Sequence, residues 1–290
     1  MRKLPVVCAA ALLLAGCGSS AVLDTAWRTG ALAKWESFPA TADPRPIVWI
    51  DGPALIQGFP SGDAKIAASC KKLELGPGVV LPAQGPDRAT ARWPNGEVVS
   101  YSAITAADAF AGWKAMPGMK DGSICEVPAL VVTAVRWGTT GFSTDRGRAQ
   151  MSAWLFDVAG VGTFEYPGVA RDGLWGGTMT TNANATTVGV TSADDRTLTL
   201  HFIGGPSEGG CRIDYTPVSF ESTRAVAVQL VAKLSANGAA ACDAVGYARE
   251  ATLTLKAPLG GRVLVDQGGN VSPVCAAETA ATPGDVRATC

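Results

Sequence analysis

The most explicit chemical pattern in the chain is Gly205-Pro206-Ser207-Glu208-Gly209, a GxSxG sequence of the kind that presents a nucleophilic serine in hydrolases. That motif needs a strand before the serine, a helix after it, and then an acid and a histidine further along the chain. Here Cys211 and a predicted strand follow the serine, and the only histidine, His201, lies upstream on the polar face of another predicted strand. We therefore interpret the segment as a hairpin loop. A Ser–Lys dyad stays formally open, although no spacing points to one.

Carboxylates offer a second route to catalysis, because an acid pair of the glycosidase type needs no histidine. Asp51, Glu97 and Asp157 are the acidic residues that we consider for this role. Acidic residues converge only in space, so the sequence leaves open a cell-envelope hydrolase that uses carboxylates. No acid, base and nucleophile set is recognisable along the chain, and we assign no catalytic residue.

Metal and cofactor motifs are not found. Asp194 and Asp195 precede a predicted strand and are interpreted as a turn, since the alternating oxygen ligands and closing glutamate of a calcium loop are missing. We therefore expect no metal and no cofactor.

The eight tryptophans raise the possibility of carbohydrate binding, because exposed aromatic rows stack on sugar rings. Trp137 and Trp154 are predicted to face each other across a hairpin, with Arg146 and Arg148 at its tip. These four side chains are the candidate binding residues. Buried aromatic packing is the more ordinary use of such tryptophans, and we favour it.

The N-terminus is typical of an exported protein. Arg2 and Lys3 precede an apolar run from Leu4 to Ala15, which is long enough for a signal peptide and too short to span a bilayer. The run ends in Leu14-Ala15-Gly16-Cys17, which resembles the lipobox of bacterial lipoproteins. That resemblance implies cleavage after residue 16, a diacylglycerol thioether on Cys17 and a flexible tether over residues 17–30. Two acyl chains suffice for a stable anchor at the outer face of the cytoplasmic membrane.

Composition and charge narrow the class of protein. The chain is 47% hydrophobic and 17% charged, with 34 glycines and 18 prolines, which favours a folded protein of short strands and turns. It carries 24 basic and 25 acidic residues; loss of Arg2 and Lys3 with the signal leaves 22 basic residues and a net charge of -3. Nucleic acid is excluded as a partner, because phosphate-backbone binding needs a surplus of Lys and Arg.

The cysteines left after signal cleavage and lipidation form an even set of six. None shows the CxxC spacing of a zinc or redox site, so outside the cytoplasm they predict disulfides. Their order along the chain favours pairing between neighbours: Cys70 with Cys125, Cys211 with Cys242, and Cys275 with Cys290.

The chain divides into two predicted domains, at residues 31–175 and 196–290, joined by a polar linker at residues 176–195. We expect an α+β N-terminal domain, with one helix against an antiparallel hairpin or sheet, followed by a small all-β antiparallel sandwich-like domain.

The elements of the N-terminal domain are predicted from local signals. Many prolines restrict its first part to short strands, and Thr105 is a good N-cap for a helix over Ala106–Ala115. The predicted strands are Ile47–Ile50, Val98–Tyr101 and a hairpin of Ala129–Trp137 with Ala149–Val158 around a turn at Thr144–Gly147, with a third short strand at Thr140–Ser143.

Alternating apolar residues mark the strands of the C-terminal domain. They are predicted at Thr197–Ile203, Ala225–Leu234, Thr252–Leu255 and Arg262–Val265, with a tight turn at Glu221–Arg224 before the second.

Several short segments together resemble a group of uncharacterised actinobacterial lipoproteins and secreted proteins. The segments are Pro44-Arg45-Pro46, Gly58-Phe59, Gly62-Asp63-Ala64-Lys65, Thr144–Ala149, Ala153–Phe156, Leu198-Thr199-Leu200, Gly204-Gly205, Cys211, Glu221-Ser222, Cys242 and Ala257–Arg262. The resemblance covers most of the mature chain and implies location and architecture, but no activity. We therefore expect a lipid-anchored, non-catalytic module that binds an unknown envelope ligand or protein, with the carboxylate hydrolase as the alternative.

Overall fold

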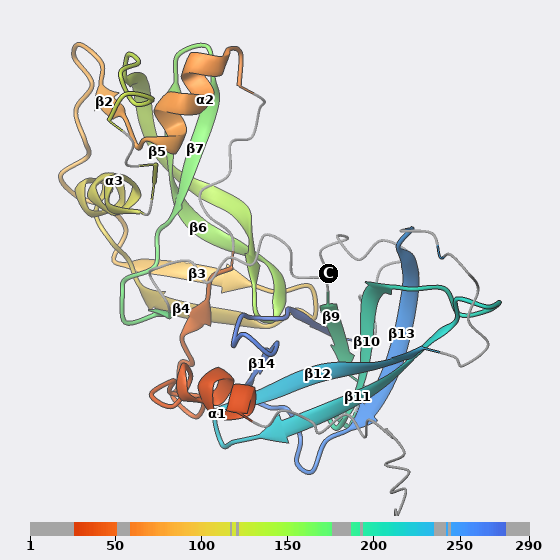
Figure 1. Ribbon diagram of the computed structural model, residues 1–290. Coiled ribbons are helices and arrows are strands. Elements are labelled where there is room, and N and C mark those ends of the chain that lie inside the picture. Colours follow the sequence, from red (N-terminus) through yellow and green to blue (C-terminus); the bar gives the residue numbers. More distant parts are fainter. Residues whose placement is uncertain are drawn as a thin grey trace, which may run out of the picture.

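The computed structural model describes residues 26–50, 59–116, 118–119, 122–175, 187–191, 194–234, 242 and 245–276. The protein is mostly β, with three short helices and several antiparallel sheets (Figure 1). The helices are α1 (Ala26–Ala33), α2 (Gly62–Ser69) and α3 (Ala106–Ala115). The strands are β1 (Ile47–Val48), β2 (Leu73–Leu75), β3 (Arg88–Arg92), β4 (Val98–Ser102), β5 (Leu130–Thr144), β6 (Gly147–Val158), β7 (Gly162–Pro167), β8 (Leu174–Trp175), β9 (Thr187–Thr191), β10 (Thr197–Gly204), β11 (Ile213–Glu221), β12 (Ala225–Leu234), β13 (Tyr247–Thr254), β14 (Val263–Val265) and β15 (Val274–Ala276).

The N-terminal sheet is built on the β5–β6 hairpin. Its strands run in the order β2-β5-β6-β3-β4, and β7 pairs with the second half of β6. The hairpin and its turn are confirmed, but the predicted third strand at Thr140–Ser143 is wrong, because these residues continue β5 to Thr144.

Helix α3 covers one side of this sheet and is confirmed at its predicted bounds. Thr105 and Asp108 form the reciprocal capping box, in which each side chain bonds the other's backbone N–H. The helix buries Trp113, whose ring packs edge-on against Phe164 of β7 at 4.9 Å between centroids. A strong local cap and a buried aromatic residue together explain why this helix could be predicted.

Helix α2 was missed, because the prolines around it indicated only short strands. Ser61 caps its N-terminus by accepting a hydrogen bond from the backbone of Ala64, and Asp63 lies in its first turn. Small alanine side chains on one face, including Ala67, let the helix pack closely on the sheet.

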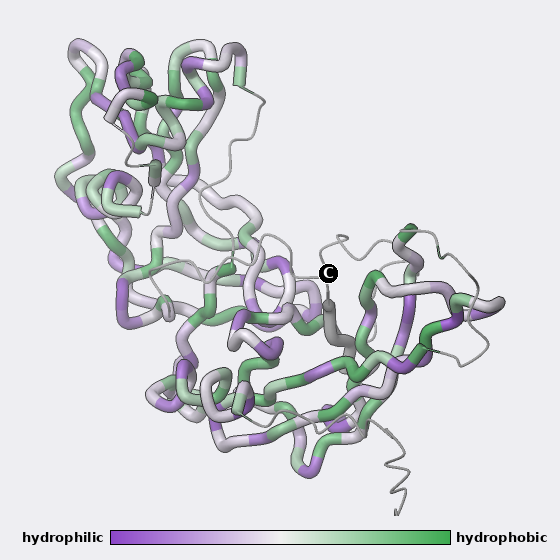
Figure 2. The backbone as a smooth tube through the Cα atoms, viewed as in Figure 1, coloured by the Kyte–Doolittle hydropathy of each residue, from purple (hydrophilic) through white to green (hydrophobic). Residues whose placement is uncertain are grey.

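The C-terminal strands form two sheets that enclose a common core. One has the order β13-β10-β9-β15 and the other the order β11-β12-β14. Leu198 and Leu200 from the first sheet pack with Val226 and Leu264 from the second. Figure 2 shows hydrophobic stretches alternating with hydrophilic ones along these strands. The sandwich is mixed rather than wholly antiparallel, because β12 pairs with β14, and β9 with β15, in parallel.

Two further sequence expectations are corrected here. Residues 187–191 of the predicted linker form β9, the central partner of β10, while residues 176–186 lie outside the described residues. The GxSxG segment is a loop, as expected, but it joins strands of different sheets, so it is not the tip of a hairpin.

The N-terminal segment packs on the C-terminal sheet. Helix α1 starts inside the predicted 17–30 tether and lies beside β12 (Figure 1). Trp35 and Phe38, which follow it, share a buried cluster with Ala227 and Val265. The Trp35 indole N–H donates to the carbonyl of Gly269 at 3.0 Å. The β11-β12-β14 sheet is therefore covered on both faces.

A buried ion pair joins the β5–β6 turn to the N-terminal segment. Asp145, in the turn, is paired with Arg45, and the two side chains are 2% and 9% exposed. The backbone N–H of Asp145 donates to Val48 at 3.1 Å, and its carbonyl accepts from Val274 at 2.9 Å. Arg45 also donates to the carbonyl of Gly261 at 2.7 Å. We call this set the turn junction.

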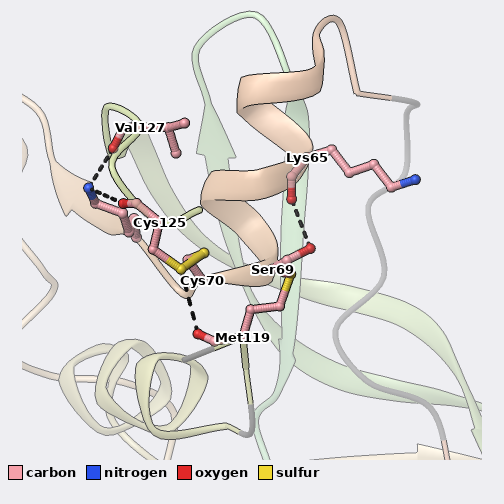
Figure 3. The surroundings of a disulfide bond; sticks show 7 residues. Lys65, Ser69, Cys70, Met119, Cys125 and Val127 are labelled. Carbon is pink, nitrogen blue, oxygen red and sulfur yellow. Dashed lines mark hydrogen bonds between the residues drawn. A yellow bond between two sulfur atoms is a disulfide. The ribbon is translucent and has the colours of Figure 1, made fainter. Parts of the chain in front are cut away.

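Two of the three predicted disulfides are confirmed: Cys70–Cys125 and Cys211–Cys242. Figure 3 shows the first, which ties the end of α2 to the segment leading to Val127. Cys275 is also disulfide-bonded, and Cys290, its predicted partner, lies outside the described residues. Disulfides form in oxidising compartments, so these bonds indicate an extracytoplasmic protein. Within the described ranges, no helix is long and apolar enough to cross a bilayer.

Replacing both Cys211 and Cys242 by serine is expected to lower the free energy of unfolding by roughly 3 to 4 kcal/mol, because their bond closes a long loop. The two residues are 31 apart in the chain and staple the open end of the β11–β12 hairpin. Urea unfolding of the oxidised protein measures the effect. Ser207→Ala, in the loop just before Cys211, is the control and should stay within about 0.5 kcal/mol. Peptide mapping checks the pairing, including Cys275 with Cys290, and a link from Cys211 to either N-terminal cysteine would contradict it.

Candidate ligand groove

An open groove of about 820 Å³ lies between α1 and the turn that joins β11 to β12. One wall is formed by α1 and the residues after it, which contribute Arg28, Leu32 and Glu36. The other wall is formed by residues 219–224 together with Lys256. The volume is within the range of small-molecule sites, so the groove is the candidate functional site.

Arg28 is fixed in the groove by an aromatic ring. Its guanidinium lies over the ring of Phe220 at 4.1 Å from the centroid, and the indole of Trp27 meets the same ring edge-on at 5.3 Å. The Nε of Arg28 is buried and has no hydrogen-bond partner. Among the described residues the guanidinium makes no ion pair. The groove therefore holds an oriented cation that has no ion-pair partner among the described residues and whose Nε is not satisfied by the protein.

Glu221 is the best-bound carboxylate of the groove. Its side chain accepts hydrogen bonds from the guanidinium of Arg262 and from the backbone N–H of Lys256, each at 2.8 Å. Burial raises the pKa of Glu221, but these hydrogen bonds and the charge of Arg262 outweigh it and hold the pKa below its usual value. Glu221 therefore stays ionised and neutralised by Arg262, while it fixes the backbone of Lys256.

The turn between β11 and β12 is rigid on the groove side. The Ser222 hydroxyl accepts from the backbone N–H groups of Arg224 at 3.2 Å and Ala225 at 3.0 Å. The Arg224 guanidinium donates to the carbonyl of Phe38 at 2.6 Å, which links the turn to the segment after α1. These bonds hold the second wall against the first.

The charges that remain on the groove favour an anionic ligand. Arg28, Arg224 and Lys256 face Glu36 and Glu221. Because Arg262 neutralises Glu221, three cations stand against the single carboxylate of Glu36. The half-buried rings and side chains of Phe220 and Leu32 supply apolar surface beside them. The arrangement suits a molecule with an acidic group and an apolar part.

The predicted tryptophan pair is formed, but it serves the core. Trp137 and Trp154 are opposite each other in the β5–β6 register, with ring centroids 5.1 Å apart. Trp154 is 2% exposed and donates its indole N–H to the carbonyl of Ile104 at 2.9 Å. Its ring is therefore unavailable for stacking on a sugar, and the buried packing favoured above describes this pair.

The two predicted arginines lie at the β5–β6 turn, apart from the tryptophans. Arg146 stacks on Trp93 at 3.9 Å and pairs with Glu97 at 3.0 Å, so it supports the turn. Arg148 is exposed and lies over the backbone of Gly141. The tryptophan pair and the arginines do not form a common surface, because Trp137 precedes the turn by more than six strand residues, roughly 20 Å.

The predicted carboxylates do not converge. Glu97 is paired with Arg146, which immediately precedes the first residue of β6. Asp157 is near the last residue of β6, about 30 Å along the strand from Arg146. Asp157 is itself bound by Arg136 and by the Thr163 hydroxyl at 2.6 Å. Asp51 lies outside the described residues.

Sequence reasoning overlooked one titratable group on this sheet. Glu165 of β7 is only 3% exposed. Burial raises its pKa, and a hydrogen bond with Thr140 and the charges of Arg148 and Arg136 oppose that rise only in part. The sequence around Glu165 gives no signal of burial, because the residues near its side chain, Thr140 and Arg148, come from other strands.

The remaining motifs have structural explanations. His201 points from the polar face of β10, as expected, with its Nδ1 3.3 Å from Glu250 on the paired strand. Asp194 and Asp195 form the expected turn, in which Asp194 accepts from the backbone of Arg196 at 3.1 Å. In the part of the chain that the structure describes, no group of three or more His, Cys, Asp or Glu side chains could hold a metal.

Comparison with known proteins finds no family model, no curated protein and no solved structure that matches the chain.

Proposed function

We propose that the protein is a lipid-anchored module at the outer face of the cytoplasmic membrane that binds an envelope ligand in the groove between α1 and the β11–β12 turn. The disulfides support an extracytoplasmic location, and the Leu14–Cys17 sequence supports an acyl anchor. The resemblance to actinobacterial lipoproteins supports the same location.

The observation that carries the binding proposal is Arg28. A guanidinium that is stacked on Phe220, with a buried Nε and no partner, is costly unless another group satisfies its donors. A buried donor without a partner calls for an explanation, and a bound anion in the groove that Arg28 lines would supply one. The position of Arg28 adds to this argument, because α1 begins only nine residues after Cys17, the proposed site of the lipid.

The hydrolase alternative gains no comparable support. Glu97 and Asp157 lie at opposite ends of β6, and Glu165, the nearest buried acid to Asp157 in the β6–β7 ladder, is almost fully covered. A glycosidase-type mechanism needs two carboxyl groups that both reach the substrate. Binding without catalysis is therefore the function that we propose.

Blocking the groove is expected to abolish ligand retention. Ala33 is exposed on the groove wall, so Ala33→Trp would fill the groove without entering the core. Ala232→Trp, at an exposed position on β12 outside the groove, is the matched control. Each protein is purified from envelope extracts, and small molecules that copurify are identified by mass spectrometry. We expect one ligand to be retained by the parent and by Ala232→Trp, and to be lost from Ala33→Trp. Equal retention by both variants would show that the groove is not the site.

A further inference from the structure

We infer that the ligand of the groove carries a phosphate group, which Arg28 and Lys256 bind together. This inference rests on the proposed binding function and specifies its chemistry. The relevant juxtaposition is two cations that line one groove, neither of which makes an ion pair with the described residues.

The donors of the two cations are available to a ligand. Arg28 contacts Phe220 through its π face, which leaves the edge of the guanidinium for hydrogen bonding. Among the described residues, Lys256 uses its backbone N–H on Glu221, and its ammonium makes no ion pair. A planar guanidinium binds two phosphate oxygens at once, and an ammonium adds a point charge on a third. The groove is also lined by Thr29 and Thr223, whose hydroxyl groups are further donors. This number of donors fits the several acceptor oxygens of a phosphate group better than the two acceptor oxygens of a carboxylate.

The single uncompensated carboxylate is separated from Arg28 along the chain. Arg28 lies in the first turn of α1, whereas Glu36 follows the last residue of this helix, so the rest of the helix, roughly 8 Å long, lies between them. Arg224 is held toward the segment after α1 by its hydrogen bond to the carbonyl of Phe38, and it adds positive charge to the groove. The Arg28 end is therefore the cationic end, where an anion would bind.

Two sources can supply this phosphate at the membrane. Residues 18–25 link Cys17 to α1 and reach at most about 29 Å when fully extended, so the groove stays close to the lipid headgroups. A soluble phosphate ester of the envelope reaches the same site. Phe220 and Leu32 would contact the apolar part of either ligand. The shared chemistry is the phosphate, and the experiment separates the sources.

The test is isothermal titration of the full chain, purified in a neutral detergent at fixed ionic strength. The probes are glycerol 3-phosphate, dihexanoyl phosphatidylglycerol and, as the carboxylate comparison, succinate. We expect at least one phosphate probe to bind, and Arg28→Gln and Lys256→Gln each to weaken its binding about tenfold or more, since each removes charge-assisted hydrogen bonds. Binding of the lipid alone identifies a headgroup as the source, and binding of glycerol 3-phosphate identifies a soluble ester.

Matched variants separate a site from general charge. Arg212→Gln and Lys233→Gln remove exposed cations of the same sheet outside the groove, and they should bind like the parent. Thermal unfolding of every variant checks that the fold is retained. The inference is wrong if succinate binds as tightly as the phosphates, if all four variants lose affinity equally, or if neither phosphate probe binds. If neither phosphate probe binds, the copurification experiment decides whether the binding function is also wrong. A ligand without phosphorus that copurifies with the parent but not with Ala33→Trp would still support binding in the groove. If Ala33→Trp retains every ligand that the parent retains, both proposals are wrong.

Discussion

Asp145→Ala is expected to lower the free energy of unfolding by about 3 to 5 kcal/mol, the cost of leaving one partner of a buried ion pair uncompensated. Asp145 and Arg45 are both at least nine-tenths buried in the turn junction. The change would leave the buried Arg45 guanidinium, which lies between Gly261 and the ring of Phe38, without a counter-charge. The change would also remove the acceptor of the Val48 backbone N–H, which donates to the Asp145 carboxylate at 3.4 Å, whereas the backbone hydrogen bonds of Asp145 to Val48 and Val274 would remain.

Urea unfolding at neutral pH measures this loss. Asp214→Ala is the matched control, because Asp214 pairs with Arg212 at a site where both side chains are about half exposed. Exposed pairs contribute only about 0 to 1 kcal/mol, so the control should be close to the parent. The double variant Arg45→Met with Asp145→Leu removes both charges and should cost less than Asp145→Ala alone. A loss for Asp145→Ala no larger than that for Asp214→Ala would contradict the assigned role.

Cys17→Ala is expected to abolish acylation and to release or mislocalise the protein, because the diacyl group is the only membrane attachment that the sequence predicts. Fractionation of cells into membrane and soluble material, followed by mass spectrometry of the N-terminus, measures the change. Cys8→Ala alters a cysteine within the predicted signal and should leave anchoring intact. If the Cys17 variant fractionates with membranes as the parent does, the lipoprotein prediction is wrong.

Elements defined by neighbouring residues could be predicted from the sequence. The bounds of α3 follow from Thr105 and Asp108, whose capping interactions span three residues. The β11–β12 hairpin follows from the Glu221–Arg224 turn, and it brings Cys211 to Cys242 as expected. Capping and turn interactions involve residues that are close in the chain, so they can be predicted directly from the sequence.

Elements defined by distant contacts were missed. The small residues of α1 resemble a tether, and the helix is stabilised by packing on β12 and β14, about two hundred residues away in the chain. β9 has a loop-like composition and gains its strand conformation from β10 and β15 on its two sides. The groove could not be predicted for the same reason, because Arg28 and Lys256 come to line the same groove only after this packing.

The docking of α1 on the last strands also sets the order in which the chain can fold. The segment around Trp35 needs Gly269 and Val265 for its cover, and in the export that we propose these two residues would cross the membrane long after it. Contacts of such long sequence separation form slowly. During the proposed translocation the side chains of Trp35 and Phe38 would therefore stay uncovered until nearly the whole chain had crossed. The protein would rely in that interval on the membrane surface or on a holding chaperone, and its groove would be completed only at the end of export.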